Sequence, residues 1–186
     1  MRSYPGMYHL ALTVIFFVFC VTVIYGGISD ITQYTIPNRV SYGLIGLFAV
    51  YAAIIFINTP SMPHLGFYVT PMLWNVAYGL ATFIFFFVFW RLGWLGGGDV
   101  KFVSAISFWM GPIYILLYVV LLGILSTGYV MLLATLFRWN PYFQDSHLPK
   151  IVKQALQKTE QKVVPYGVPA AIAAVAVAPF AMAHFY

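Results

Sequence analysis

Long runs of apolar residues dominate this sequence and constrain its fold more than any other feature. An α-helix needs about 20 consecutive apolar residues to cross the hydrocarbon core of a bilayer. Residues 8–28, 40–57 and 72–90 are three such runs. Hydrophobic residues make up 62% of the chain and charged residues 7%, a composition that argues against a water-soluble domain. We therefore expect a single membrane-embedded domain that covers residues 1–186.

The remaining apolar sequence predicts three further helices. The next run is about twice as long as one helix needs, and it contains Gly111-Pro112, where proline cannot continue the helical hydrogen-bond ladder. We divide it into helices at 94–110 and 113–137. An alanine-rich segment at 163–184 provides the last helix, which is expected to pack closely against its neighbours. The predicted fold is all-α, a polytopic transmembrane bundle of six helices.

The basic residues predict the orientation of this bundle. Lys and Arg accumulate in the short loops that remain on the cytoplasmic side of a membrane. Eight of the nine basic residues lie in alternate connections between the predicted helices: Arg39, Arg91, Lys101, Arg138, Lys150, Lys153, Lys158 and Lys162. We therefore expect both termini outside and the charged connections in the cytoplasm. The formal charge of +5 then reflects topology and anionic lipid headgroups rather than nucleic-acid binding.

The cytoplasmic loop at 138–162 is the longest polar stretch. Its apolar residues recur at helical spacing, which predicts a helix on the membrane surface; they are Leu148, Ile151, Val152, Ala155 and Leu156. A solvated basic linker that enforces the topology is an equally good interpretation.

Neither a metal nor a cofactor is expected. Cys20 is the only cysteine, so the chain cannot form an internal disulfide or a paired-cysteine zinc site. His9, His64, His147 and His184 share no ligand spacing.

Four acidic residues occur in the whole chain, and two of them accompany membrane helices. Asp145 and Glu160 belong to the polar loop, where solvation explains them. Asp30 directly follows the first predicted helix, and Asp99 lies in a glycine-rich segment between apolar runs. A carboxylate at membrane depth costs about 2.5 to 3.5 kcal/mol on insertion scales, so such residues are functional by default.

Helix parity predicts that Asp30 and Asp99 meet. The chain leaves Asp30, crosses the membrane twice and reaches Asp99, so both carboxylates lie at the cytoplasmic face. Two carboxylates at close range in a low dielectric share one proton. Such a pair contains an acid and a base together, which is what the hydrolysis of a peptide bond needs.

The glycines before Asp99 have two interpretations. Because Gly96, Gly97 and Gly98 lack a Cβ atom, they can adopt unusual backbone angles and let an extended substrate approach the main chain. Small residues also let membrane helices cross closely. We interpret Lys101 as a topology anchor and assign it no chemistry.

Three motifs resemble those of the type IV prepilin peptidases. Asp30-Ile-Thr-Gln-Tyr-Thr-Ile-Pro-Asn38 is similar to the first aspartate motif of that family. Gly96-Gly-Gly-Asp-Val-Lys101 resembles its second motif, a Gly-x-Gly-Asp signature shared more loosely with archaeal preflagellin peptidases, presenilin and signal peptide peptidase. Val164-Pro-Tyr-Gly-Val-Pro169 resembles the segment that opens the last helix of the family.

The resemblance implies an aspartic endopeptidase of the inner membrane that faces the cytoplasm. It would remove the short basic leader of type IV prepilin-like precursors, after a glycine and just before the hydrophobic stem. Asp30 and Asp99 match the catalytic pair of the family. The residues implied to shape the site around them are Pro37, Asn38, Tyr166 and Gly167.

The short connection after Asp30 also distinguishes this chain within that family. The bifunctional prepilin peptidases have a cytoplasmic domain between their first two helices, associated with methyl transfer, whereas this chain has only residues 30–39 there. It therefore looks like the short peptidases of tight-adherence (Flp-type) pilus systems.

Two other functions are compatible with some of these features. Intramembrane aspartates also serve proton or cation transport. Against transport, both acids lie at one face and no acid continues a pathway through the later helices. A catalytically inactive assembly scaffold is the third possibility, and the presence of both aspartates argues against it.

Overall fold

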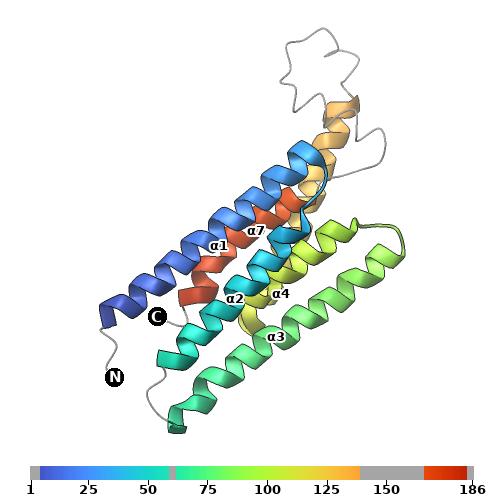
Figure 1. Cartoon of the computed structure of the whole chain (residues 1–186). Helices are drawn as coiled ribbons and strands as arrows, with labels where there is room; N and C mark the ends of the chain where they lie inside the picture. The colour runs from blue at the N-terminus through green and yellow to red at the C-terminus, as the bar shows by residue number, and fades with distance from the viewer. Residues whose placement is uncertain (1–4, 59–61, 139–165, 184–186) are drawn as a thin grey trace.

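The computed structural model describes residues 5–58, 62–138 and 166–183, and within these ranges the chain forms only helices. They are α1 (Pro5–Gln33), α2 (Asn38–Asn58), α3 (Met62–Arg91), α4 (Gly97–Arg138) and α7 (Gly167–Ala183), shown in Figure 1. Four of them are long and apolar enough to cross a membrane, and α7 is a shorter apolar helix. The prediction of an all-α fold with several helices able to cross a membrane is therefore confirmed.

The predicted count of six helices is not supported, because the fourth and fifth predicted helices form the single element α4. The only non-helical backbone angles inside α4 are those of Gly111, with φ 61° and ψ 179°. This region of backbone space is essentially restricted to glycine. The chain therefore reverses at the predicted position without a connecting loop. Figure 1 shows the two arms of α4, 97–110 and 112–138, running in opposite directions, and residues of both arms line one cavity.

Other helix ends also differ from those predicted. The first helix continues past residue 28 to Gln33, so Asp30 lies on the last turn of α1 instead of following it. The third helix begins at Met62 rather than at 72, and α4 begins at Gly97 rather than at 94. Apolar content predicts only the part of a helix that lies inside the hydrocarbon core. Backbone hydrogen bonding can extend the helix beyond that part into more polar sequence, so α1 and α3 are longer than predicted. Residues 139–162 of the predicted cytoplasmic loop lie outside the described residues.

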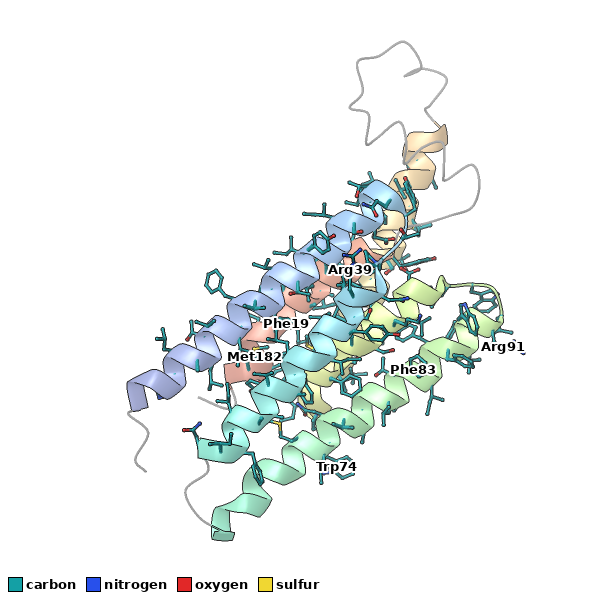
Figure 2. All side chains as sticks on the ribbon, in the orientation of Figure 1. Phe19, Arg39, Trp74, Phe83, Arg91 and Met182 are labelled. Carbon is teal, nitrogen blue, oxygen red and sulfur yellow. The ribbon has the colours of Figure 1, made fainter. Side chains whose placement is uncertain are left out.

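The core lies between α1, α2, α7 and both arms of α4. Trp109 lies within this core. The centroid of the Trp109 ring system is 4.7 Å from the ring centroid of Phe19 and 5.6 Å from that of Phe48. The Trp109 Nε1–H donates a hydrogen bond to the Leu44 carbonyl at 3.2 Å. Alanines of α7 are buried against α1 and α4, as predicted for close packing. In contrast, the apolar side chains of α3 that the structure describes, from residue 72 onward, are mostly exposed, including the Phe83 labelled in Figure 2.

Both aspartate-bearing segments lie at one end of the bundle. This end contains the last turn of α1 and the first turns of α2, α4 and α7, while α1 begins and α7 ends at the opposite end (Figure 1). Arg39 and Arg91 also lie at the aspartate end, as Figure 2 shows. The side of the membrane that this end faces stays a prediction.

Candidate active site

Asp30 is buried at the junction of α1 and α7. Its side chain is 3% exposed, and its Oδ2 atom accepts a hydrogen bond from the backbone N–H of Gly167 at 2.6 Å. Gly167 is the first residue of α7, and the unpaired N–H groups and dipole at a helix N-terminus favour a carboxylate there. The contact joins residues that are 137 positions apart in the sequence. Asp30 is therefore fixed to the start of the last helix.

The turn after α1 holds Ile36 beside Asp30. Tyr34 adopts a left-handed backbone conformation with φ 53°, and its N–H donates to the Asp30 carbonyl at 2.9 Å. The Ser29 hydroxyl donates to the Thr35 carbonyl at 3.1 Å. These bonds close the end of α1, and Ile36 is buried immediately after them.

Ile36 is also the point where the two aspartate motifs touch. A Cβ atom on Gly98 would lie 3.5 Å from the Ile36 carbonyl oxygen, and one on Gly167 would lie 2.9 Å from Ile36 Cδ1. The glycine-rich motif and the start of α7 therefore both pack against one residue of the first motif.

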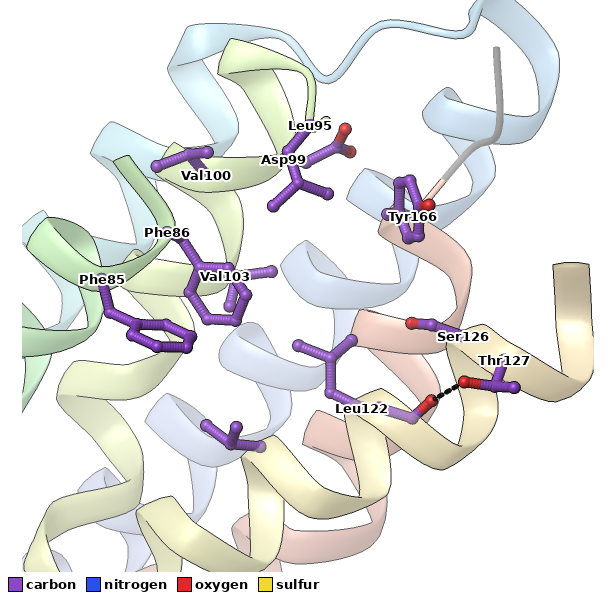
Figure 3. Close-up of a pocket in the computed structure, with 12 residues that line it drawn as sticks. Phe85, Phe86, Leu95, Asp99, Val100, Val103, Leu122, Ser126, Thr127 and Tyr166 are labelled. Atoms are coloured by element: carbon purple, nitrogen blue, oxygen red, sulfur yellow. Dashed lines mark hydrogen bonds between the residues drawn. The ribbon is translucent and has the colours of Figure 1, made fainter. Parts of the chain in front are cut away.

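Asp99 lies on the first turn of α4, where its charge also meets a helix N-terminus. The backbone of Gly96 makes a hydrogen bond with its carboxylate. Asp99 is half-buried and lines a cavity that Tyr166 also borders (Figure 3). Asp30 and Asp99 interact electrostatically. The structure thus places the two carboxylates that the sequence singled out at one end of the bundle and within electrostatic range of each other.

The three predicted glycines contribute close packing rather than unusual angles. None of them has a positive φ, which occurs instead at Gly93 and Gly111 among the described glycines. A Cβ on Gly96 would lie 2.8 Å from Asp99 Oδ2, and one on Gly97 would lie 3.3 Å from the indole nitrogen of Trp90. The approach of a substrate to these glycines stays a prediction, and none of the three has the positive φ that only glycine adopts readily.

The first loop residues are held by contacts that the sequence did not reveal. The Pro37 carbonyl accepts a hydrogen bond from the Val40 N–H at 2.9 Å. Asn38 begins α2, and its Oδ1 atom accepts a hydrogen bond from Lys101 Nζ at 3.0 Å. Lys101, to which we assigned no chemistry, therefore joins the first loop to α4.

Three tyrosines surround the carboxylates, and sequence reasoning identified only Tyr166. Burial raises the pKa of Tyr166, and the charge of Asp99 raises that pKa further. Burial and then the charge of Asp30 raise the pKa of Tyr34. Tyr129, on the second arm of α4, also interacts electrostatically with Asp30. Its place on an apolar helix gave no signal in the sequence.

Among the residues that the structure describes, no three His, Cys, Asp or Glu side chains gather in one place. The polar groups of the site are carboxylates, tyrosine hydroxyls and backbone N–H groups. Carboxylates and hydroxyls of this kind can bind, donate and accept protons.

Comparison with known protein families gives one match. A model described as the type IV leader peptidase family matches residues 17–133, which are more than half of the 186 residues and include both aspartates. No curated protein and no solved structure matches the chain.

Proposed function

This chain belongs to the type IV leader peptidase family, and from that premise we propose that it removes the basic leader of prepilin-like precursors by diaspartyl activation of water. The family makes the chain a peptidase, and its long apolar helices make it a multi-pass membrane protein. The aspartic mechanism, the precursor substrate, the inner-membrane location and the cytoplasmic orientation are parts of the proposal. The family match gives no support to transport through the same aspartates.

The observation that carries the proposal is the junction at Ile36. Gly98, the residue before Asp99, packs against Ile36 of the Asp30 motif, and so does Gly167, whose N–H binds Asp30. The two carboxylates also interact electrostatically. A pair of carboxylates that shares one proton offers a base for the attacking water and an acid for the scissile carbonyl or the leaving amine. The titration belongs to the pair, so the two roles are assigned to the pair and not to either residue.

Asn substitutions provide a sharp test of this mechanism. In Asp30→Asn, the amide oxygen can still accept the hydrogen bond from the Gly167 N–H, so the packing at α7 is retained while the exchangeable proton and the charge are lost. Cells would co-express the chain with a candidate prepilin, and leader removal would be followed by gel mobility. We expect Asp30→Asn and Asp99→Asn each to slow cleavage by at least about 100-fold, since general acid–base catalysis contributes factors of this size.

Asp145→Asn is the matched control, because it makes the same chemical change in the loop predicted at 138–162. It should cleave at the rate of the wild type. Processing that survives both Asp30→Asn and Asp99→Asn would sink the diaspartyl mechanism.

A further inference from the structure

A cavity of about 290 Å³ opens beside Asp99. Its walls come from α3, from both arms of α4 and from Tyr166 at the start of α7 (Figure 3). This volume is close to the lower limit of small-ligand pockets in proteins, which are about 300 to 1,000 Å³. The cavity is thus large enough for side chains of a bound peptide.

The polar side chains of the cavity, Asp99, Tyr166, Ser126 and Thr127, lie along one side of it, and the rings of Phe85 and Phe86 lie along the other (Figure 3). Figure 3 shows Asp99 and Tyr166 at one end, with the Ser126 hydroxyl on the same side as Tyr166. Phe86 and Leu122 form apolar walls farther from the carboxylate. A peptide in a membrane needs hydrogen-bond partners for its backbone and apolar space for its side chains, whereas a lipid chain needs no polar partners. The distribution fits a peptide whose cleaved bond lies at Asp99.

We propose that this cavity is a specificity subsite that receives the first apolar side chains of the substrate stem, next to the cleaved bond. The inference rests on the proposed function and adds to it which residues select the substrate. The second arm of α4 contributes a single face to this wall, because its residues there lie three, four, seven and eight positions after the first of them: Val119, Leu122, Gly123, Ser126 and Thr127.

Gly123 lies in the middle of this face and offers a direct test. A Cβ atom added to Gly123 meets nothing within 4 Å, so a side chain can start there without a clash, and Gly123→Leu adds bulk to the cavity wall. Gly128 is also on the second arm and also has open space at its Cβ position, but it does not line the cavity. Gly128→Leu is therefore a matched control for added bulk and for the lost glycine.

The experiment measures the cleavage rates of three versions of one precursor, which differ only in the first residue of the stem: Ala, Leu or Phe. We expect Gly123→Leu to lower the Phe-to-Ala ratio of cleavage rates at least about tenfold, since a single methylene group in an apolar pocket changes discrimination by about 10- to 200-fold. Val119→Ala, which enlarges the cavity, should raise the same ratio. The Gly128→Leu variant should keep the wild-type ratio.

Two results would overturn the subsite: equal rate losses on all three precursors, or unchanged ratios in both Gly123→Leu and Val119→Ala. Because the readout is a ratio, a lower yield of folded enzyme does not alter it. The wild-type rate separates the two proposals. If the wild type does not cleave any precursor, the proposed function is wrong. If the wild type cleaves and the variants have the same Phe-to-Ala ratio of rates, only the subsite is wrong.

Discussion

Asp30 and Asp99 lie at the same end of the bundle in different surroundings. Asp30 is 3% exposed and is bound to the first N–H of α7. Asp99 is half-buried and borders the cavity. One carboxylate belongs to the packed framework, and the other faces space that a substrate can enter. From this contrast we expect Asp30 to hold a fixed position and Asp99 to be the more adjustable of the two carboxylates.

Two glycines allow this difference to be measured with the same substitution. A Cβ atom at Gly167 or at Gly96 would lie 2.8 Å from the Oδ2 atom of its aspartate. At Gly167 it would also meet Asp30 Cβ and Ile36 Cδ1, both at 2.9 Å. At Gly96 the next atom is Asp99 Cγ at 3.7 Å.

We expect Gly167→Ala to have the larger effect, a loss of about 100-fold in cleavage rate, because a misplacement of about 1 Å at a catalytic group costs that much. Gly96→Ala should cost less than about tenfold, since the Asp99 side chain can rotate toward the cavity. Single-turnover cleavage rates of purified variants would measure both losses.

Gly43→Ala is the control, because a Cβ atom there meets nothing within 4 Å. Equal losses in Gly167→Ala and Gly96→Ala would remove the contrast between a fixed and an adjustable carboxylate.

Lys101→Met tests the bond between the two motifs and should have an intermediate effect. The Lys101–Asn38 hydrogen bond is exposed, and a hydrogen bond contributes about 0.5 to 1.5 kcal/mol net, so we expect the cleavage rate to fall about two- to tenfold. Asn38→Ala should cause a similar loss, and the double variant should lose no more than either single variant, since both remove one interaction. Additive losses would show that the two side chains act separately.

Arg91→Met is the control for Lys101→Met. It removes another exposed positive charge at the same end of the bundle. Its rate should stay close to that of the wild type if the bond to Asn38, and not the charge alone, matters.

The smallest expected effect concerns stability at alkaline pH. Burial raises the pKa of Tyr34 and Tyr166 above the ordinary value of 10.0, with a further contribution from the nearest aspartate in each case. The folded state then retains these protons more tightly than the unfolded state. Their contribution to stability is complete below pH 10 and is lost as the pH rises through the raised values.

Thermal unfolding in detergent between pH 8 and pH 11 would test this effect. Above about pH 10, the Tm of the wild type should fall more steeply than that of Tyr34→Phe or Tyr166→Phe, by a few degrees at most. Parallel curves for the three proteins would contradict the proposed environments of these tyrosines.

The sequence was sufficient to predict where the helical segments lie, but not their ends or their count, and to predict that both aspartates lie at one end. Apolar runs predicted the helical segments, Gly111-Pro112 predicted the reversal in α4, and helix parity predicted that Asp30 and Asp99 share one end. These features depend on local composition and on the order of the crossings.

The contacts that shape the site could not be predicted in this way. The bond from Gly167 to Asp30 spans 137 positions, and the bond from Lys101 to Asn38 spans 63. Each bond depends on how one helix is rotated about its own axis relative to its neighbour. The helices of this chain are apolar on all sides, so the pattern of apolar residues does not predict that rotation. The extension of α1 beyond residue 28 was missed for a related reason: Thr32 satisfies its hydroxyl by donating to the Ile28 carbonyl at 2.9 Å, so polar sequence continues the helix.

The reversal at Gly111 has a mechanical consequence for the cavity. The two arms of α4 form opposite walls of that space and are joined at the far end through one non-helical residue. Asp99 lies 12 residues from Gly111, a lever of about 18 Å at 1.5 Å per residue. A rotation of about 5° at this pivot moves the carboxylate by about 1.6 Å with every helical hydrogen bond of the arms intact. The two arms of the hairpin therefore open and close about Gly111, which lies against Asn75 in the interior of α3 rather than at an end of the bundle.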